Sequence, residues 1–299
     1  AGPHDVVGVV SQPDRPRGRG RRARPSPVAE LALEQGLPLL RPEKVGAPDA
    51  VEALRGLAPD LGVVVAFGQF LPRTVRELPA RGYLINAHAS LLPRHRGAAP
   101  VAHAILAGDE ETGISVMRVE REMDAGPVAL VKRTPIGPRE TAGELTARLA
   151  ELAAEALAEA LDRIADGRVT WTPQDDARAT VAPKIEREDA RLDWREPAAA
   201  LARRVRAMAP RPGAFTLLEG EPLRILEAHA EPGPVGAAPG TVRLEGGGVR
   251  IATGEGWLVP ERLQRAGGRP LAVQDFLRGR PLPEGVRLGA DADAATFED

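Results

Sequence analysis

The stretch YLINAHASLLPRHRGAAP occupies residues 83–100 and joins a short apolar run to a group of polar residues. If residues 83–89 form a β-strand, Asn86 and His88 lie two positions apart and project from the same face of the sheet. In an open α/β sheet, ligands bind beyond the carboxyl ends of the strands. The stretch therefore predicts an α/β fold with a polar site at the end of this strand.

Short apolar runs alternate with helical patterns on both sides of this stretch, as in successive βα units. Three consecutive valines at 63–65 are typical of a parallel strand that is covered on both faces. Ser26 and Pro27 are typical of the N-cap and first position of a helix at 28–35. Thr141 and Glu144 form a capping-box signature for a long helix that Gly167 ends. We expect strands at residues 6–10, 37–40, 61–67, 83–89, 114–119 and 128–131, and helices at 28–35, 50–57, 98–106 and 141–164.

The second half of the chain has a different pattern. Residues 169–183 are polar without a clear period, which suits a linker. A short amphipathic helix follows, with Leu201, Val205 and Met208 on one face. From residue 214 onward, short β-like runs are separated by glycine-rich breaks, so we expect a small sandwich or barrel.

Composition limits the possible classes of protein. The 299 residues favour two domains, and the formal net charge is −2. The absence of cysteine excludes disulfides, thiolate catalysis, cysteine-bound zinc and iron–sulfur clusters. No apolar run approaches the roughly 18–20 residues of a membrane helix, and no secretory signal is present, so we expect a cytoplasmic protein without membrane partners. The chain begins at Ala1, almost within an apolar run, and we expect that a preceding segment is missing.

The sequence RPRGRGRRAR at residues 15–24 carries six arginines and no acid. A buried element would not tolerate this charge, so we expect a mobile, solvated loop. Its natural partner is a phosphate backbone, which arginine binds through charge-assisted hydrogen bonds. The alternative is a solvated loop without a partner, because arginine makes up nearly all of the 40 basic residues of the chain.

Asn86 and His88 could both donate hydrogen bonds to an oxygen that gains negative charge. Asp124, in the sequence EMDAGPV, could set the tautomer and the charge of His88. The structural alternatives are a pair of satisfied polar groups at a strand end and a turn residue that bonds its own backbone. The five histidines show no paired spacing of metal ligands, so we predict no metal site.

These signals, in this order, resemble the methionyl-tRNA formyltransferase family of folate-dependent formyltransferases. The resemblance runs from about residue 4 into the C-terminal β region. It rests on SQPDRPRGRG (11–20), PSPV (25–28), VVVAFGQFLP (63–72), NAHASLLPRHRGAAP (86–100), GDEETGISVM (108–117), MDAGPV (123–128) and RLDW (191–194).

The resemblance implies a Rossmann-like N-terminal formyltransferase domain with a parallel sheet (1–167), a linker (168–186) and a C-terminal all-β, OB-like, tRNA-binding domain (187–299). It implies formyl transfer from 10-formyltetrahydrofolate, as a co-substrate, to the amino group of methionyl initiator tRNA, and we expect a monomer without a metal. The implied catalytic residues are Asn86, His88 and Asp124. The implied folate-binding residues are Val65, Ala66, Phe67, Gly68, Gln69, Phe70, Leu71, Ser90, Leu91, Leu92 and Pro93, and the implied tRNA-binding residues are Arg15, Arg17, Arg19, Arg21, Arg22 and Arg24.

Two features depart from the family pattern. The family begins with a further strand and helix before the run at 6–10, and His95 stands where an aromatic residue is common. Related formyltetrahydrofolate hydrolases can carry a histidine at this position. A formyltransferase or hydrolase that acts on another amine therefore stays an alternative, as does an RNA-binding remnant without catalysis.

Overall fold

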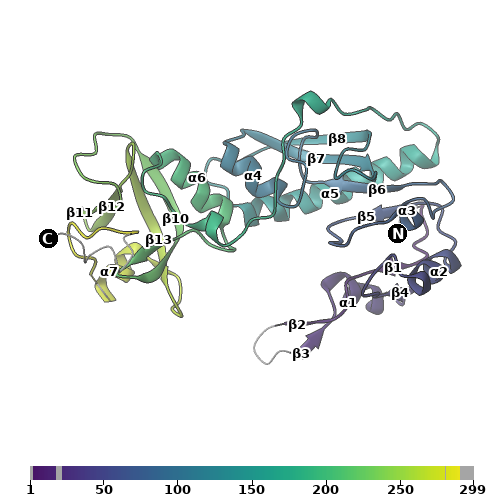
Figure 1. The fold of residues 1–299 in the computed structure, drawn as a ribbon, viewed down its shortest axis with the longest axis horizontal. Coiled ribbons are helices and arrows are strands. Elements are labelled where there is room, and N and C mark those ends of the chain that lie inside the picture. Colours follow the sequence, from purple (N-terminus) through teal and green to yellow (C-terminus); the bar gives the residue numbers. More distant parts are fainter. Residues whose placement is uncertain (1–2, 18–21, 280, 290–299) are drawn as a thin grey trace. The chain divides into compact units, whose positions relative to one another are not determined.

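The computed structural model describes residues 3–17, 22–279 and 281–289 and divides the chain into two compact units (Figure 1). Unit 1 comprises residues 1–88, 114–132 and 153–179. Unit 2 comprises residues 89–113, 133–152 and 180–299. The long helix α5 (Ala142–Ala165) contributes to both units.

Unit 1 is built on parallel strand pairs with helices. Strand β1 (Val9–Val10) runs parallel to β4 (Leu39–Leu40), and β5 (Gly62–Val64) runs parallel to β6 (Leu84–His88). Strands β7 (Glu111–Arg118) and β8 (Val128–Pro135) complete a sheet of order β5-β6-β7-β8, in which β7 is antiparallel to β6. The expected parallel α/β sheet is thus present, with an antiparallel addition. The helices are α1 (Pro27–Glu34), α2 (Pro48–Gly56) and α3 (Arg73–Arg76).

The predicted helix ends are confirmed at two places. The Ser26 hydroxyl accepts a hydrogen bond from the Ala29 N–H at 3.1 Å and caps α1. At the start of α5, the Thr141 N–H donates to Glu144 Oε2 at 2.9 Å and the Glu144 N–H donates to Thr141 Oγ1 at 3.3 Å. Gly167, with φ +68°, ends the helix in the left-handed conformation.

Strand β5 is not covered on both faces, so this expectation was wrong. Val63 and Val65 are 45% and 53% exposed. The strand lies at the edge of its sheet and borders an apolar groove of about 840 Å³, which side chains from β1 and the C-terminal part of α5 also line. The strand at 6–10 is also shorter than expected, because only Val9–Val10 pairs with a neighbour.

Unit 2 contains the predicted all-β region, curled into a half-barrel. Five strands have the order β11-β12-β13-β10-β9, and β14 pairs with β13. Their bounds are β9 (Phe215–Leu218), β10 (Glu221–Glu231), β11 (Val242–Glu245), β12 (Gly248–Ala252), β13 (Trp257–Arg265) and β14 (Leu271–Ala272). The helices of this unit are α4 (Pro100–Ala107), α6 (Ala198–Met208) and α7 (Val273–Gly279).

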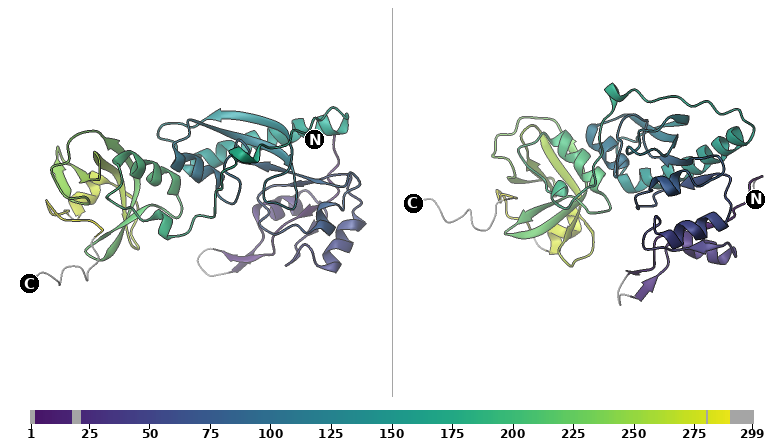
Figure 2. Two further views of the ribbon diagram at one scale, coloured as in Figure 1. Left: turned by 45° about the horizontal axis from the view of Figure 1, so that its top comes forward. Right: turned by 45° about the vertical axis from the view of Figure 1, so that its right-hand side comes forward.

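Helix α6 packs on β10 and β13 (Figure 2). Leu201, Val205 and Met208 are each at most 1% exposed and join the core of the sheet, which confirms the predicted apolar face. In the same core, the Trp194 indole N–H donates to Thr216 Oγ1 at 3.0 Å. The buried indole therefore keeps its hydrogen bond as well as its packing.

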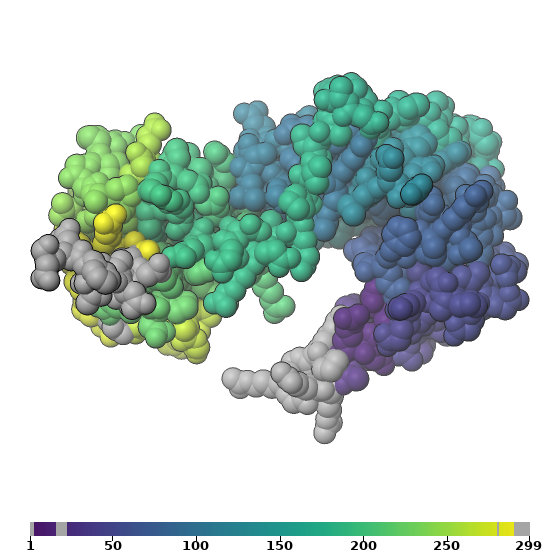
Figure 3. All heavy atoms as spheres, in the orientation of Figure 1, coloured from purple at the N-terminus to yellow at the C-terminus, as the bar shows by residue number. Residues whose placement is uncertain are grey.

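The segment after α5 has little regular structure but makes specific contacts. Residues 168–179 lie on the surface of unit 1 in the space-filling view (Figure 3) and contain one short 3-10 helix, Asp176–Arg178. Thr172 pairs with Val128 through two backbone hydrogen bonds, of 2.8 and 2.9 Å. The Trp171 ring meets the Tyr83 ring edge-on, with centroids 5.5 Å apart. This polar stretch is thereby fixed to the sheet.

Candidate functional site

Strand β6 presents Asn86 and His88 from one face, as the two-residue spacing predicts. Leu84 and Ile85 at its start are 6% and 0% exposed, and this burial fixes the register of the strand. Asn86 lies opposite Met117 and His88 opposite Ser115 in the antiparallel pairing with β7. Asn86 stays partly accessible, whereas His88 is only 5% exposed.

The structure brings Asp124 to His88. Asp124 Oδ2 lies 3.5 Å from His88 Nδ1, and the two side chains are 15% and 6% exposed. The carboxylate therefore faces Nδ1 of the imidazole at the end of β6. The contact that the sequence could only suggest is present, while the catalytic roles of the three residues stay predictions.

The turn that carries Asp124 is tightly constrained. Asp124 has φ +52°, a left-handed conformation that aspartate tolerates better than most residues. A Cβ atom on Gly126 would lie 2.0 Å from the carbonyl oxygen of Arg118, so only glycine fits there. The Arg118 N–H donates to the carbonyl oxygen of Pro127 at 3.0 Å. Glycine at position 126 is thus required by the close approach of the turn to the end of β7.

Gln174 is a residue of this site that the sequence did not reveal. Its Nε2 donates to the carbonyl oxygens of Asp124 and Gly126, each at 2.7 Å. The residue lies 50 positions from Asp124 in a stretch that was interpreted as a linker. No period or motif marks it, because the contact depends only on how the chain returns to the sheet.

The first group of predicted folate-binding residues, 65–71, forms an irregular segment after β5. Ala66 and Gly68 have φ values of +46° and +78°, and Gln12 Nε2 donates to the carbonyl oxygen of Phe67 at 2.7 Å. Both ends of the Gln69 amide bind backbone groups: Oε1 accepts from the Val45 N–H at 2.8 Å, and Nε2 donates to the carbonyl oxygen of Pro42 at 3.1 Å. Phe70 is 77% exposed, so it offers an apolar surface. The side chains of Gln12 and Gln69 thus hold this segment, while Val65, Ala66 and Phe70 are exposed.

The second group, residues 90–93, belongs to unit 2. The Ser90 hydroxyl is fully buried and donates to the carbonyl oxygen of Arg94 at 2.6 Å. Further along the loop, His95 is 6% exposed and its Nε2 lies 2.7 Å from Asp109 Oδ2. Arg94 also binds Asp109, at 2.6 Å. The histidine at this unusual position therefore has a structural partner of its own.

The basic stretch does not form an irregular loop at its flanks, so that expectation was wrong for them. Strands β2 (Arg15–Arg17) and β3 (Arg22–Arg24) form an antiparallel pair that projects from unit 1 in Figures 1 and 2. Arg15 pairs with Arg24, and both are exposed. Exposed side chains at Arg15 and Arg24 let this strand pair carry their charge without burying it. The predicted positions Arg19 and Arg21 lie outside the described residues.

The ribbon places arginine positions directly opposite one another. In the register, Arg15 lies opposite Arg24 and Arg17 lies opposite Arg22. The two pairs are two residues apart along each strand, so these positions share one face of the strand pair. Like charges that face each other across strands are destabilising. The phosphate partner expected for this stretch stays a prediction.

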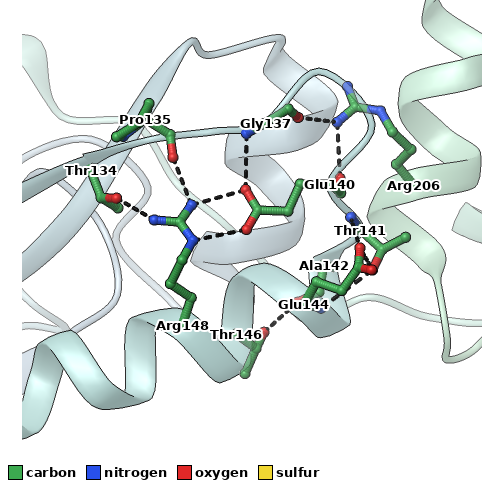
Figure 4. Close-up of polar contacts among 10 residues, drawn as sticks. All are labelled: Thr134, Pro135, Gly137, Glu140, Thr141, Ala142, Glu144, Thr146, Arg148 and Arg206. Atoms are coloured by element: carbon green, nitrogen blue, oxygen red, sulfur yellow. Dashed lines mark hydrogen bonds and ion pairs between the residues drawn. The ribbon is translucent and has the colours of Figure 1, made fainter.

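A second polar cluster connects α5 and α6 in unit 2 (Figure 4). Glu140 accepts from Arg148 Nε and Nη2 at 3.0 and 2.9 Å and from the Gly137 N–H at 2.9 Å. The bonds from Arg148 are the largest cause that lowers the pKa of Glu140. Arg206 donates to the carbonyl oxygen of Glu140 at 3.0 Å, and its pKa is lowered by burial and by the nearby Arg203. The cluster is a structural connection with satisfied partners.

Across residues 3–17, 22–279 and 281–289, histidine, aspartate and glutamate side chains do not gather in a group of three that could hold a metal ion. In the same part of the chain, no helix has the length and apolar character needed to cross a membrane.

The comparisons with known proteins define the class. The family "Formyl transferase" matches residues 1–161, and "Formyl transferase, C-terminal domain" matches residues 184–281. The chain therefore belongs to the formyl transferase family.

Curated relatives narrow this class. The chain is 46% identical to the methionyl-tRNA formyltransferase of Sorangium cellulosum over 288 residues, which cover 95% of the chain and 92% of that protein. It is 47% identical to the methionyl-tRNA formyltransferase of Roseiflexus castenholzii, covering 96% and 91%. Among solved structures, HypX from Aquifex aeolicus in complex with tetrahydrofolic acid shares the fold, with a TM-score of 0.58 and 24% identity over 83% of this chain and 43% of that one.

Proposed function

We propose that the protein transfers the formyl group of 10-formyltetrahydrofolate to the amino group of methionyl initiator tRNA, a reaction of translation initiation in the cytoplasm. The observation that carries the proposal is the contact of His88 with Asp124 beside Asn86, in a chain with full-length methionyl-tRNA formyltransferase relatives. A folate donor agrees with the tetrahydrofolate-bound structure of the same fold.

The reaction forms a bond between the methionyl nitrogen and the formyl carbon and breaks the bond from that carbon to N10 of the folate. The attacking amine loses a proton, and the departing N10 gains one. Negative charge develops on the formyl oxygen during the attack. Asn86 and a protonated His88 would donate hydrogen bonds to this oxygen, while Asp124 would hold His88 and assist removal of the proton from the amine.

The exposed β2–β3 ribbon supports RNA as the carrier of the amine. Its paired arginine positions fit the phosphate backbone, and binding to phosphates through arginine depends strongly on salt. We assign this contact to six arginines, of which Arg19 and Arg21 lie outside the described residues: Arg15, Arg17, Arg19, Arg21, Arg22 and Arg24. Folate binding is assigned to the segments 65–71 and 90–93.

The test supplies the labelled formyl donor to the protein with methionyl initiator tRNA, with uncharged tRNA or without RNA. We expect label on the methionyl nitrogen in the first reaction alone. Release of formate at the same rate in all three reactions would indicate a hydrolase and would contradict the proposal. Salt-dependent tRNA binding without any formylated product would indicate an RNA-binding protein without catalysis.

A further inference from the structure

Gln174 and Asp124 form a connected arrangement within unit 1. The Gln174 amide nitrogen has two N–H donors and donates to two carbonyl oxygens of the turn of Asp124. One carbonyl is that of Asp124 itself and the other is that of Gly126. A single side chain therefore bridges two peptide groups of the turn.

The backbone conformation of the bridged turn is not one that the local sequence favours by itself. Asp124 has a positive φ, which costs free energy for a residue with a Cβ atom and persists only where surrounding contacts enforce it. On one side, Gly126 lies against the carbonyl of Arg118, and Pro127 accepts from the Arg118 N–H. Gln174 supplies contacts to the turn from another segment.

The segment that carries Gln174 is itself fixed. Thr172, two residues earlier, makes both backbone hydrogen bonds with Val128, directly after the turn. The Arg118 guanidinium lies over the Trp171 ring at 4.3 Å and over the Tyr83 ring at 4.2 Å. The amide of Gln174 is thus presented from an anchored piece of chain, which makes its geometry well defined.

We infer that Gln174 is a positioning residue of the reaction, acting through Asp124. By holding the two carbonyls, it keeps the Asp124 carboxylate within 3.5 Å of His88 Nδ1. Gln174 touches the backbone of the turn and need not touch a substrate. The inference rests on the proposed function, because Asp124 matters for the rate only if His88 and Asp124 take part in catalysis.

The test removes the N–H donors of the Gln174 side chain, in one variant while keeping a side chain of similar volume. Gln174→Met has a similar length but no N–H group, and Gln174→Ala removes the whole amide. Displacement of a catalytic group by about 1 Å can cost about 100-fold in rate. We therefore expect kcat for formyl transfer to fall by about 10- to 100-fold in both variants, with KM for the donor and for methionyl-tRNA changed by less than about 3-fold.

A double-mutant cycle separates positioning from general stability. In an Asp124→Asn background, adding Gln174→Met should lower single-turnover rates by less than about 3-fold, because the carboxylate that it positions is already gone. Gln35→Met is the matched control, since Gln35 is exposed at the end of α1 in unit 1, outside the proposed site. Its kcat should equal that of the unmodified protein.

Three outcomes are distinct. A folded Gln174→Met variant with kcat within about 2-fold of the unmodified protein would overturn the inference, as would an equal fold-loss in both backgrounds of the cycle. In either case, formylation by the unmodified protein would leave the proposed function intact. Failure of the unmodified protein to formylate methionyl-tRNA would instead refute the proposed function, and the inference with it.

Discussion

Replacement of Glu140 by glutamine tests the polar cluster of Figure 4. The carboxylate is 15% exposed and receives two N–H groups of Arg148 and one of Gly137. A hydrogen bond to a charged group contributes about 1.5–3 kcal/mol. Arg148 is 39% exposed, so solvent screens part of this interaction. Glutamine keeps one acceptor oxygen, and we expect a loss of about 2 kcal/mol in the free energy of unfolding of unit 2.

The loss should depend on pH in a defined direction. The pKa of Glu140 is lowered from its ordinary value of 4.5, mainly by the bonds from Arg148. A carboxylate with a depressed pKa stabilises the folded state above its unfolded pKa, and this contribution disappears as pH falls through the folded value. The difference in the free energy of unfolding between the unmodified protein and Glu140→Gln should therefore have its full size at pH 7 and shrink steadily below about pH 4.5.

Scanning calorimetry at several pH values measures this effect. At pH 7 the transition of unit 2 should move down by roughly 4–8 °C, since 1 kcal/mol corresponds to about 2–4 °C for a unit of this size. Glu52→Gln is the matched control, because Glu52 is 74% exposed and pairs with Arg55 on the surface of α2, where ion pairs contribute little. An unchanged transition at pH 7, or a loss of equal size at pH 7 and pH 3, would refute the reasoning.

Two further substitutions test the site and the ribbon. Gly126→Ala places a methyl group 2.0 Å from the Arg118 carbonyl oxygen and should lower kcat by about 100-fold. Gly56→Ala is the control, because nothing lies within 4 Å of the added methyl group, and it should leave kcat unchanged. Equal kcat values for the two variants would contradict the role of the turn. Replacement of both Arg15 and Arg24 by alanine should reduce the slope of log Kd for tRNA against log salt by about 1.4–1.8, and an unaltered slope would exclude the ribbon as the phosphate contact.

The sequence predicted those parts of the fold that depend on local chemistry. The caps of α1 and α5 follow from single side chains and their nearest amides. The strand pair formed by residues 15–17 and 22–24 could not be predicted, because the charge of these residues argues against a regular element; Arg15 and Arg24 nevertheless pair while both stay exposed. The exposure of Val63 could not be read from its apolar neighbours, because it depends on which strand lies beside β5 in the sheet.

In the site, too, features set by local sequence could be predicted and contacts between distant segments could not. The projection of Asn86 and His88 from the same face of β6 follows from the two-residue period of a strand. Asp124 could be suggested as a partner of His88, but its own sequence is that of an ordinary turn and does not show the contact. Gln174 could not be predicted, because its two hydrogen bonds join segments about 50 residues apart. Contacts of this kind are properties of the folded chain and leave no local pattern.

The central claim is that His88, held by Asp124, promotes formyl transfer to methionyl-tRNA. The most direct measurement is the single-turnover rate of formylation by the unmodified protein and by His88→Ala under saturating donor and tRNA. Loss of one donor to the developing oxyanion costs about 100- to 1,000-fold. We predict a fall of this size with tRNA binding unchanged, and a His88→Ala rate within about 3-fold of the unmodified protein would contradict the account.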